Sequence, residues 1–187
     1  NSSFRNAAGP QAGWPDLDGN GISDLVRVNS AGNVTATLFS DGGTFLTEIS
    51  SGNILNLPAG FEILAWPDLD GDGNDDLVIQ NDQTGASIGY LMDGLTISSS
   101  GQLPGLPAQG GFRTIGFPDL DGQDGADLVI QAASGFTVGY ILTDGLTIAS
   151  SGTIAGKPSA NWTTIGFPDL DGNGTADIVL QEDGGFT

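Results

Sequence analysis

The sequence contains neither cysteine nor histidine among its 187 residues. Disulfide bonds, thiol catalysis and cysteine-based zinc sites are therefore excluded, and without imidazole the usual general base and most transition-metal sites are also excluded. Lysine and arginine together number only 4, too few to neutralise the phosphates of a nucleic acid or the head groups of an anionic membrane. No apolar run reaches the roughly 18 residues of a membrane-spanning helix. We therefore expect no nucleic-acid partner and no insertion into a membrane.

Acidic residues, in contrast, are numerous and clustered. Aspartate and glutamate number 23 and give a formal net charge of -19, although only 14% of the residues are charged. Nearly all of this acid is aspartate. Hydrophobic residues make up 38% of the chain, which is typical of a folded domain and not of an acidic disordered tail. The negative charge is thus concentrated in particular segments of a globular chain.

A repeat of about 50 residues organises the chain. Four segments align: WPDLDGNGISDLVRV, WPDLDGDGNDDLVIQ, FPDLDGQDGADLVIQ and FPDLDGNGTADIVLQ, whose first aspartates are Asp16, Asp68, Asp119 and Asp169. The spacings between these aspartates are 52, 51 and 50 residues. We predict a single repeat domain over 1–187, with units at about 14–60, 61–111, 112–161 and a partial unit at 162–187. Residues 1–13 are expected to be a linker or a segment that pairs with a sheet edge.

Each complete unit is predicted to form four antiparallel strands. In the second unit the strands are expected at 61–67, 76–80, 87–92 and 95–100, and in the third at 112–118, 127–131, 136–142 and 146–151. β-Branched and aromatic residues fill these runs, with Pro, Gly, Asn and Asp between them, and the Asp-Gly pairs at 93–94 and 144–145 predict tight hairpins. Four short strands per unit are typical of a β-propeller blade. The sequence predicts an all-β protein of about three and a half blades, which is part of a longer propeller or is completed by a neighbouring chain.

The aspartate-rich loops have the pattern D-x-D-G-[NDQ]-[GD]-x-x-D, which predicts calcium binding. Calcium takes 6–8 oxygen ligands, several of them carboxylates, from a flexible loop. We expect side-chain oxygens from loop positions 1, 3, 5 and 9 and a main-chain carbonyl from position 7, with up to four Ca²⁺ in the chain. The predicted ligands are Asp16, Asp18, Asn20, Ile22 (carbonyl) and Asp24 at site one; Asp68, Asp70, Asp72, Asn74 (carbonyl) and Asp76 at site two; Asp119, Asp121, Gln123, Gly125 (carbonyl) and Asp127 at site three; and Asp169, Asp171, Asn173, Thr175 (carbonyl) and Asp177 at site four.

The four loops are not equivalent. Site two has a carboxylate at position 5, so we expect it to bind calcium most tightly, whereas Gln123 and Asp124 depart from the pattern and predict a weaker site three. The competing interpretation is that the loops are solvated hairpin turns, but three carboxylates within nine residues repel one another unless a cation lies among them. An EF-hand is rejected because its loop needs Glu at position 12 and flanking helices, and that position holds Arg27, Ile79, Ile130 and Leu180.

The aromatic-Pro-Asp lead, the aspartate loop and the following DLVIQ-type strand resemble the FG-GAP/VCBS repeats, the calcium-loop blades of integrin alpha-subunit propellers and of many bacterial surface proteins. The resemblance implies that calcium lies in the loop between the first two strands of each blade, at the propeller rim. It also implies a secreted or cell-surface location and roles in adhesion, ligand binding or scaffolding.

The sequence therefore favours a calcium-stabilised extracellular structural or binding module for adhesion or surface assembly, without catalytic residues or an organic cofactor of its own. Its expected partners are a protein or glycan surface ligand, or copies of itself. Three alternatives remain: a lectin-like propeller, a subunit of a polymeric surface fibre, and a propeller appended to a polysaccharide-active enzyme. Sugar stacking on aromatic rings would be the basis of the lectin alternative, although core packing is the favoured role of these residues: Trp14, Trp66, Trp162, Tyr90 and Tyr140.

Overall fold

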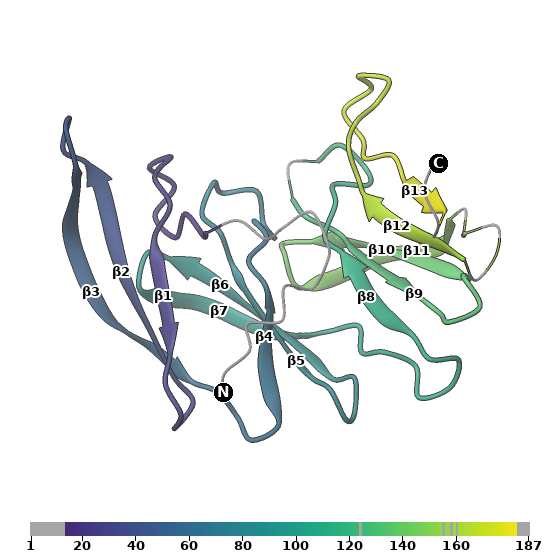
Figure 1. The fold of residues 1–187 in the computed structure, drawn as a ribbon, viewed down its shortest axis with the longest axis horizontal. Coiled ribbons are helices and arrows are strands. Elements are labelled where there is room, and N and C mark those ends of the chain that lie inside the picture. The colour runs from purple at the N-terminus through teal and green to yellow at the C-terminus, as the bar shows by residue number, and fades with distance from the viewer. Residues whose placement is uncertain (1–13, 124, 155, 158, 160, 183–187) are drawn as a thin grey trace.

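The computed structural model describes residues 14–123, 125–154, 156–157, 159 and 161–182, which form thirteen β-strands and no helix. They build four antiparallel sheets that follow one another along the chain (Figure 1). The first sheet contains β1 (Leu25–Val28), β2 (Asn33–Asp41) and β3 (Leu46–Asn56); the second β4 (Phe61–Ala65), β5 (Leu77–Asn81), β6 (Ser87–Asp93) and β7 (Thr96–Leu103); the third β8 (Arg113–Gly116), β9 (Leu128–Gln131), β10 (Thr137–Thr143) and β11 (Thr147–Ile154); and the fourth β12 (Trp162–Gly166) and β13 (Val179–Glu182).

The two central sheets confirm the prediction of four-stranded antiparallel units. In both, strands adjacent in sequence are adjacent in space, because each is joined to the next by a turn or loop. The predicted N-terminal linker or edge-pairing segment, 1–13, lies outside the described residues, as does 183–187, where the partial fourth unit ends. The described part is all-β, and its sheets are those of propeller-type blades.

Strand boundaries differ from the predicted ones at the aspartate-rich loops. The second strand was expected to begin at Asp76 and Asp127, but β5 and β9 begin one residue later, at Leu77 and Leu128. The reason is that each aspartate closes its loop: Asp76 N–H donates to the Pro67 carbonyl (2.7 Å), and Asp127 N–H to the Pro118 carbonyl (2.8 Å). The fourth strands, β7 and β11, run further than expected because their pairing with β6 and β10 continues to the end of the hairpin.

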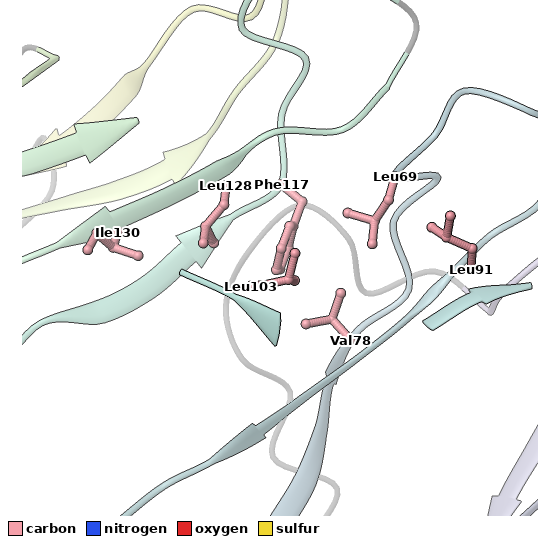
Figure 2. Packing of buried hydrophobic residues seen from close by; sticks show 7 residues of the cluster. All are labelled: Leu69, Val78, Leu91, Leu103, Phe117, Leu128 and Ile130. Carbon is pink, nitrogen blue, oxygen red and sulfur yellow. The ribbon is translucent and has the colours of Figure 1, made fainter. Parts of the chain in front are cut away.

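The hydrophobic core lies between successive sheets. Val78, Leu91 and Leu103 of the second sheet pack with Leu128 and Ile130 of the third, together with Leu69 and Phe117 (Figure 2). On the opposite face of the second sheet, Leu77, Ile79 and Met92 pack against residues of the first sheet. Alternate side chains of a strand point to opposite faces, so both faces of β5 are buried. Face-to-face stacking of this kind is how propeller blades form a core without helices.

Buried polar bridges also join neighbouring sheets. Gln80 Nε2 on β5 donates to Thr114 Oγ1 on β8 (3.1 Å), and Gln131 Nε2 on β9 donates to Thr164 Oγ1 on β12 (3.3 Å). Each amide also donates within its own sheet, to Ser87 or Thr137. A buried amide that lost these partners would incur a desolvation cost, so the bridges fix the register of one sheet against the next.

We predict that Ile130→Ala lowers the free energy of unfolding by about 2–5 kcal/mol, because it leaves a cavity between the second and third sheets. Chemical denaturation followed by circular dichroism measures this loss. The matched control is Ile148→Ala on β11, the same chemical change at a side chain that is 49% exposed. Equal losses in the two variants would contradict the stacked-sheet core.

Candidate metal centres

Each aspartate-rich loop is closed at its neck by one main-chain hydrogen bond. Counting from the first aspartate, the N–H of the ninth residue donates to the carbonyl of the proline that precedes position 1. The four bonds are Asp24 to Pro15 (2.6 Å), Asp76 to Pro67 (2.7 Å), Asp127 to Pro118 (2.8 Å) and Asp177 to Pro168 (2.8 Å). The shared neck brings positions 1 and 9 together.

The ninth-position carboxylate ties the loop to the third strand of its sheet. Asp76 Oδ2 accepts from the N–H of Leu69 (2.8 Å), and its Oδ1 accepts from the N–H of Met92 on β6 (2.8 Å). A bulge between Leu91 and Met92 interrupts the pairing of β6 with β7 at the residue that donates. The same pair of bonds recurs in the neighbouring loops, with Asp24 accepting from Leu17 and Phe39 and Asp127 from Leu120 and Leu142.

The first-position carboxylate orders the loop itself. Asp68 accepts from the N–H groups of Gly71 (2.8 Å) and Gly73 (3.0 Å), both of which have positive φ, 75° and 92°. A residue with a side chain is strained in this conformation, so glycine at positions 4 and 6 lets the chain wrap around the carboxylate. Asp169 accepts from the same two loop positions, Gly172 and Gly174. Asp16 accepts from Gly21 at position 6 and from Asn20 at position 5.

The carboxylates of positions 1, 3 and 9 converge in all four loops. In each triad the three aspartates offer oxygen atoms that lie within 4.8 Å of one another: Asp16, Asp18 and Asp24; Asp68, Asp70 and Asp76; Asp119, Asp121 and Asp127; Asp169, Asp171 and Asp177. Two oxygens on opposite sides of one Ca²⁺ lie about 4.6–5.2 Å apart, since each Ca–O distance is about 2.3–2.6 Å. The triads therefore have the dimensions of one shared cation.

The fifth-position side chains are placed differently. Asn20, Asp72 and Asn173 each accept from the N–H of the residue two positions on, which is an Asx turn. Asp72 also accepts from Asn74 Nδ2 and is not among the three carboxylates that converge in its loop. Ligation by the fifth position, including Gln123, and by the seventh-position carbonyls stays a prediction, as does the ranking of the sites. Asp124, the second departure in loop three, lies outside the described residues.

The electrostatics of the loops favour a bound cation. Burial raises the pKa of Asp76 to about 7, and the charges of Asp70 and Asp68 add to this rise while two backbone hydrogen bonds oppose it. Burial also raises the pKa of Asp24, Asp68, Asp70 and Asp127. Within the part of the chain that the structure describes, no ion pair joins any of these carboxylates to an arginine or lysine. The described residues therefore do not supply the positive charge that would normally stabilise buried carboxylates.

One oxygen atom gives a direct test of whether a cation fits. Asp18 Oδ1 is buried without a hydrogen-bond partner, although its carboxylate belongs to the triad of loop one. A buried acceptor without a partner costs free energy, and a cation between the three carboxylates would satisfy it. The donor set of carboxylates and carbonyls without nitrogen or sulfur fits a hard cation such as Ca²⁺.

Loop four is more open than the others. Two members of its triad are exposed, and hydrogen bonds from the loop backbone, that of Gly174 foremost, lower the pKa of Asp169. In loops one to three, burial instead raises the pKa of five triad members: Asp24, Asp68, Asp70, Asp76 and Asp127.

The structure adds one residue that the sequence analysis did not single out. Asp75, at position 8 of loop two, accepts from the N–H of Asp16 in loop one (2.8 Å). The only sequence signal is an aspartate where the other loops have Ser23, Ala126 and Ala176.

We predict that the metal-free protein loses stability as pH rises from about 3.8 to about 7. Over this window folded Asp76 keeps a proton that the unfolded chain has lost, so the folded state binds more protons and rising pH favours unfolding. Excess Ca²⁺ should reverse the slope, because the ion binds the charged form. Melting temperatures across the window, with EDTA and with Ca²⁺, measure both slopes. Asp76→Asn should flatten the EDTA profile, and an unchanged profile would contradict the assignment.

Comparisons with known proteins find similarity to a repeat family and to a solved structure. A family model described as FG-GAP-like repeat matches residues 16–79, which contain the first two loops and the first sheet. The Tc holotoxin pore of Photorhabdus luminescens shares the fold with a TM-score of 0.63 at 20% identity, over 91% of this chain and 8% of that chain. The chain thus spans less than a tenth of that neighbour. No curated protein sequence matches the chain. Residues 16–79 are therefore similar to FG-GAP-like repeats.

Proposed function

We propose that the chain is a calcium-stabilised structural or binding module that works outside the cell, in adhesion or surface assembly. The observation that supports this proposal is the fourfold recurrence of three aspartates with oxygens within 4.8 Å of one another, each set in a loop that leads into a β-strand. A ligand that binds only the folded state stabilises it by mass action. Each loop would then act as a metal clamp between the first two strands of a unit.

Calcium suits these loops better than magnesium. Magnesium requires near-ideal octahedral geometry and usually keeps several waters, whereas calcium accepts 6–8 oxygens in an irregular arrangement. Each loop offers three carboxylates together with nearby main-chain and amide oxygens, on a turn rich in glycine. Millimolar calcium, as found outside cells, saturates even weak sites of this class. An extracellular location and a protein or glycan partner follow from this proposal and from the FG-GAP-like repeat.

Carbohydrate binding through aromatic stacking has less support. Trp66 and Tyr90 pack against the cluster between the first and second sheets, and Tyr140 packs against the cluster between the second and third. Their rings are therefore partly used in the core, as the sequence favoured. Of the aromatic residues considered for sugar stacking, Trp14 is the most exposed, at 68%. The proposal likewise assigns no catalytic residue to this segment. Within the described residues, no helix is long and apolar enough to cross a membrane.

We expect calcium to raise the melting temperature strongly and EDTA to abolish the gain. A concentration 100 times the dissociation constant contributes about 2.7 kcal/mol at a single site. Thermal unfolding in Ca²⁺, in equal Mg²⁺ and in EDTA measures the effect, with size analysis on the same samples. Equal melting temperatures in the three buffers would reduce the loops to ordinary turns and refute the proposal.

A second experiment assigns the ion to a particular loop. Asp70→Asn neutralises an exposed member of the second triad and should reduce the bound calcium, counted by equilibrium dialysis, by one ion per chain. The matched control is Asp82→Asn, which makes the same change at an exposed residue in the β5–β6 turn. If both variants bound as much calcium as the parent protein, Asp70 would not be a ligand.

A further inference from the structure

Neighbouring loops are hydrogen-bonded directly to one another. The N–H at position 8 of each later loop donates to the carbonyl of the first aspartate of the loop before it. The three bonds are Asp75 to Asp16, Ala126 to Asp68 and Ala176 to Asp119, each 2.8 Å. Their recurrence at all three junctions between described loops marks them as part of the repeat. The acceptor in each bond is a predicted metal ligand, at position 1 of its loop. The donor, at position 8 of the next loop, directly precedes that loop's predicted ligand at position 9.

Close packing reinforces these bonds. A Cβ added to Gly125 in loop three would lie 2.6 Å from the carbonyl oxygen of Leu69 in loop two, and one added to Gly19 would lie 3.0 Å from the carbonyl oxygen of Gly73. Because these glycines lack a Cβ, the backbones of neighbouring loops pack closely against one another. A loop that changes shape would therefore disturb the loop beside it.

The junction between loops one and two has a second connection. Asp75 Oδ2 accepts from the N–H of Asp16 (2.8 Å), so the peptide groups on both sides of the Asp16 Cα are held by one residue of loop two. Asp16 is the first carboxylate of site one, and Asp75 directly precedes Asp76, the last carboxylate of site two. Ala126 and Ala176 offer no such acceptor at the other two junctions.

We propose that the metal sites are energetically coupled through these junctions, and that Asp75 is the positioning residue that couples site one to site two. The inference rests on the proposed function. An ion at site two fixes Asp76 and hence Asp75, which holds Asp16 in place for an ion at site one. Coupling between binding sites is reciprocal, so an ion at site one favours site two by the same factor. Binding is then positively cooperative at this junction, and more weakly at the two junctions that have only the main-chain bond.

The test is a double-mutant cycle read at site one. The parent is Trp66→Phe, a change already present at the equivalent Phe117 and Phe167, so that Trp14 is the one tryptophan that leads a metal loop. Tb³⁺ is a hard cation that seeks oxygen ligands, and a nearby tryptophan sensitises its emission. The Trp14-sensitised signal that Asp18→Asn abolishes is the site-one signal. Asp70→Asn then impairs site two. Its effect on the site-one signal is measured twice, once with Asp75 intact and once in the Asp75→Ala background.

With Asp75 intact, Asp70→Asn should raise the Tb³⁺ concentration that half-saturates site one at least about fivefold, the lower end of typical coupling. With Asp75→Ala the same change should matter less than about twofold. Because the cycle compares ratios, a uniform loss of affinity from removing one negative charge cancels. Ala126 and Ala176 show that the repeat accepts alanine at this position, and Asp75→Ser, which introduces the residue type that loop one has at Ser23, provides a second variant.

Equal ratios in the two backgrounds would overturn the role of Asp75, and a ratio near one with Asp75 intact would overturn the coupling itself. Either result leaves the calcium proposal standing, because site one still binds. A parent protein that gives no sensitised signal and no calcium-dependent melting would instead overturn the proposed function. Asp82→Asn in place of Asp70→Asn is the control for charge, and it should leave the site-one midpoint unchanged.

Discussion

The ninth-position carboxylate is the interaction on which each unit of this protein depends. In the second unit, both oxygens of Asp76 accept main-chain hydrogen bonds, one from the loop and one from β6, while its own N–H closes the loop neck. This single residue therefore joins three segments that would otherwise be held only by turns. Its burial carries an electrostatic cost that the described residues do not offset with an arginine or lysine. A bound cation offsets that cost where it arises, so the metal would complete the hydrogen-bonded frame of the blade.

Two glycines in the third strands of the central sheets allow leucines to pack closely against those strands. Gly89 on β6 and Gly139 on β10 lie where a Cβ would come within 2.8 Å of leucine side chains, Leu146 in one case and Leu120 in the other. Leu120 occupies position 2 of its aspartate-rich loop, and its N–H donates to Asp127. Gly139 in the third strand of its sheet thus leaves the space that this loop leucine fills. The same close contacts therefore hold both the loop and the stacked sheets, so a substitution that moves the loop would also disturb the packing between the sheets.

The sequence predicted the features that depend on local spacing. The period follows from comparing the four loops, and the four strands of the central units and the aspartates at positions 1, 3 and 9 can be read within one unit, because alternation and turn residues act over a few positions. The features that it did not predict join distant residues. Met92 donates to Asp76 from 16 positions away, through a bulge without a sequence signature, and Asp75 reaches Asp16 across 59 positions. The first residue of the second strand was misplaced for the same reason, since Asp76 is drawn into the loop by a proline carbonyl.

The first two loops are held in place by the unit that follows each of them. The leucine at position 2 is buried in both, with Leu17 and Leu69 0% and 2% exposed. The carbonyl of Leu17 accepts from Gly94 in the hairpin of the next sheet (2.9 Å), and Leu69 lies against the corresponding hairpin at Gly145. Each of these loop sequences therefore supplies the carboxylates, whereas the succeeding repeat supplies contacts that hold them in place. Since preorganised ligands bind with less loss of conformational entropy, the affinity of a cation for either loop would depend on the following unit as well as on the loop's own aspartates.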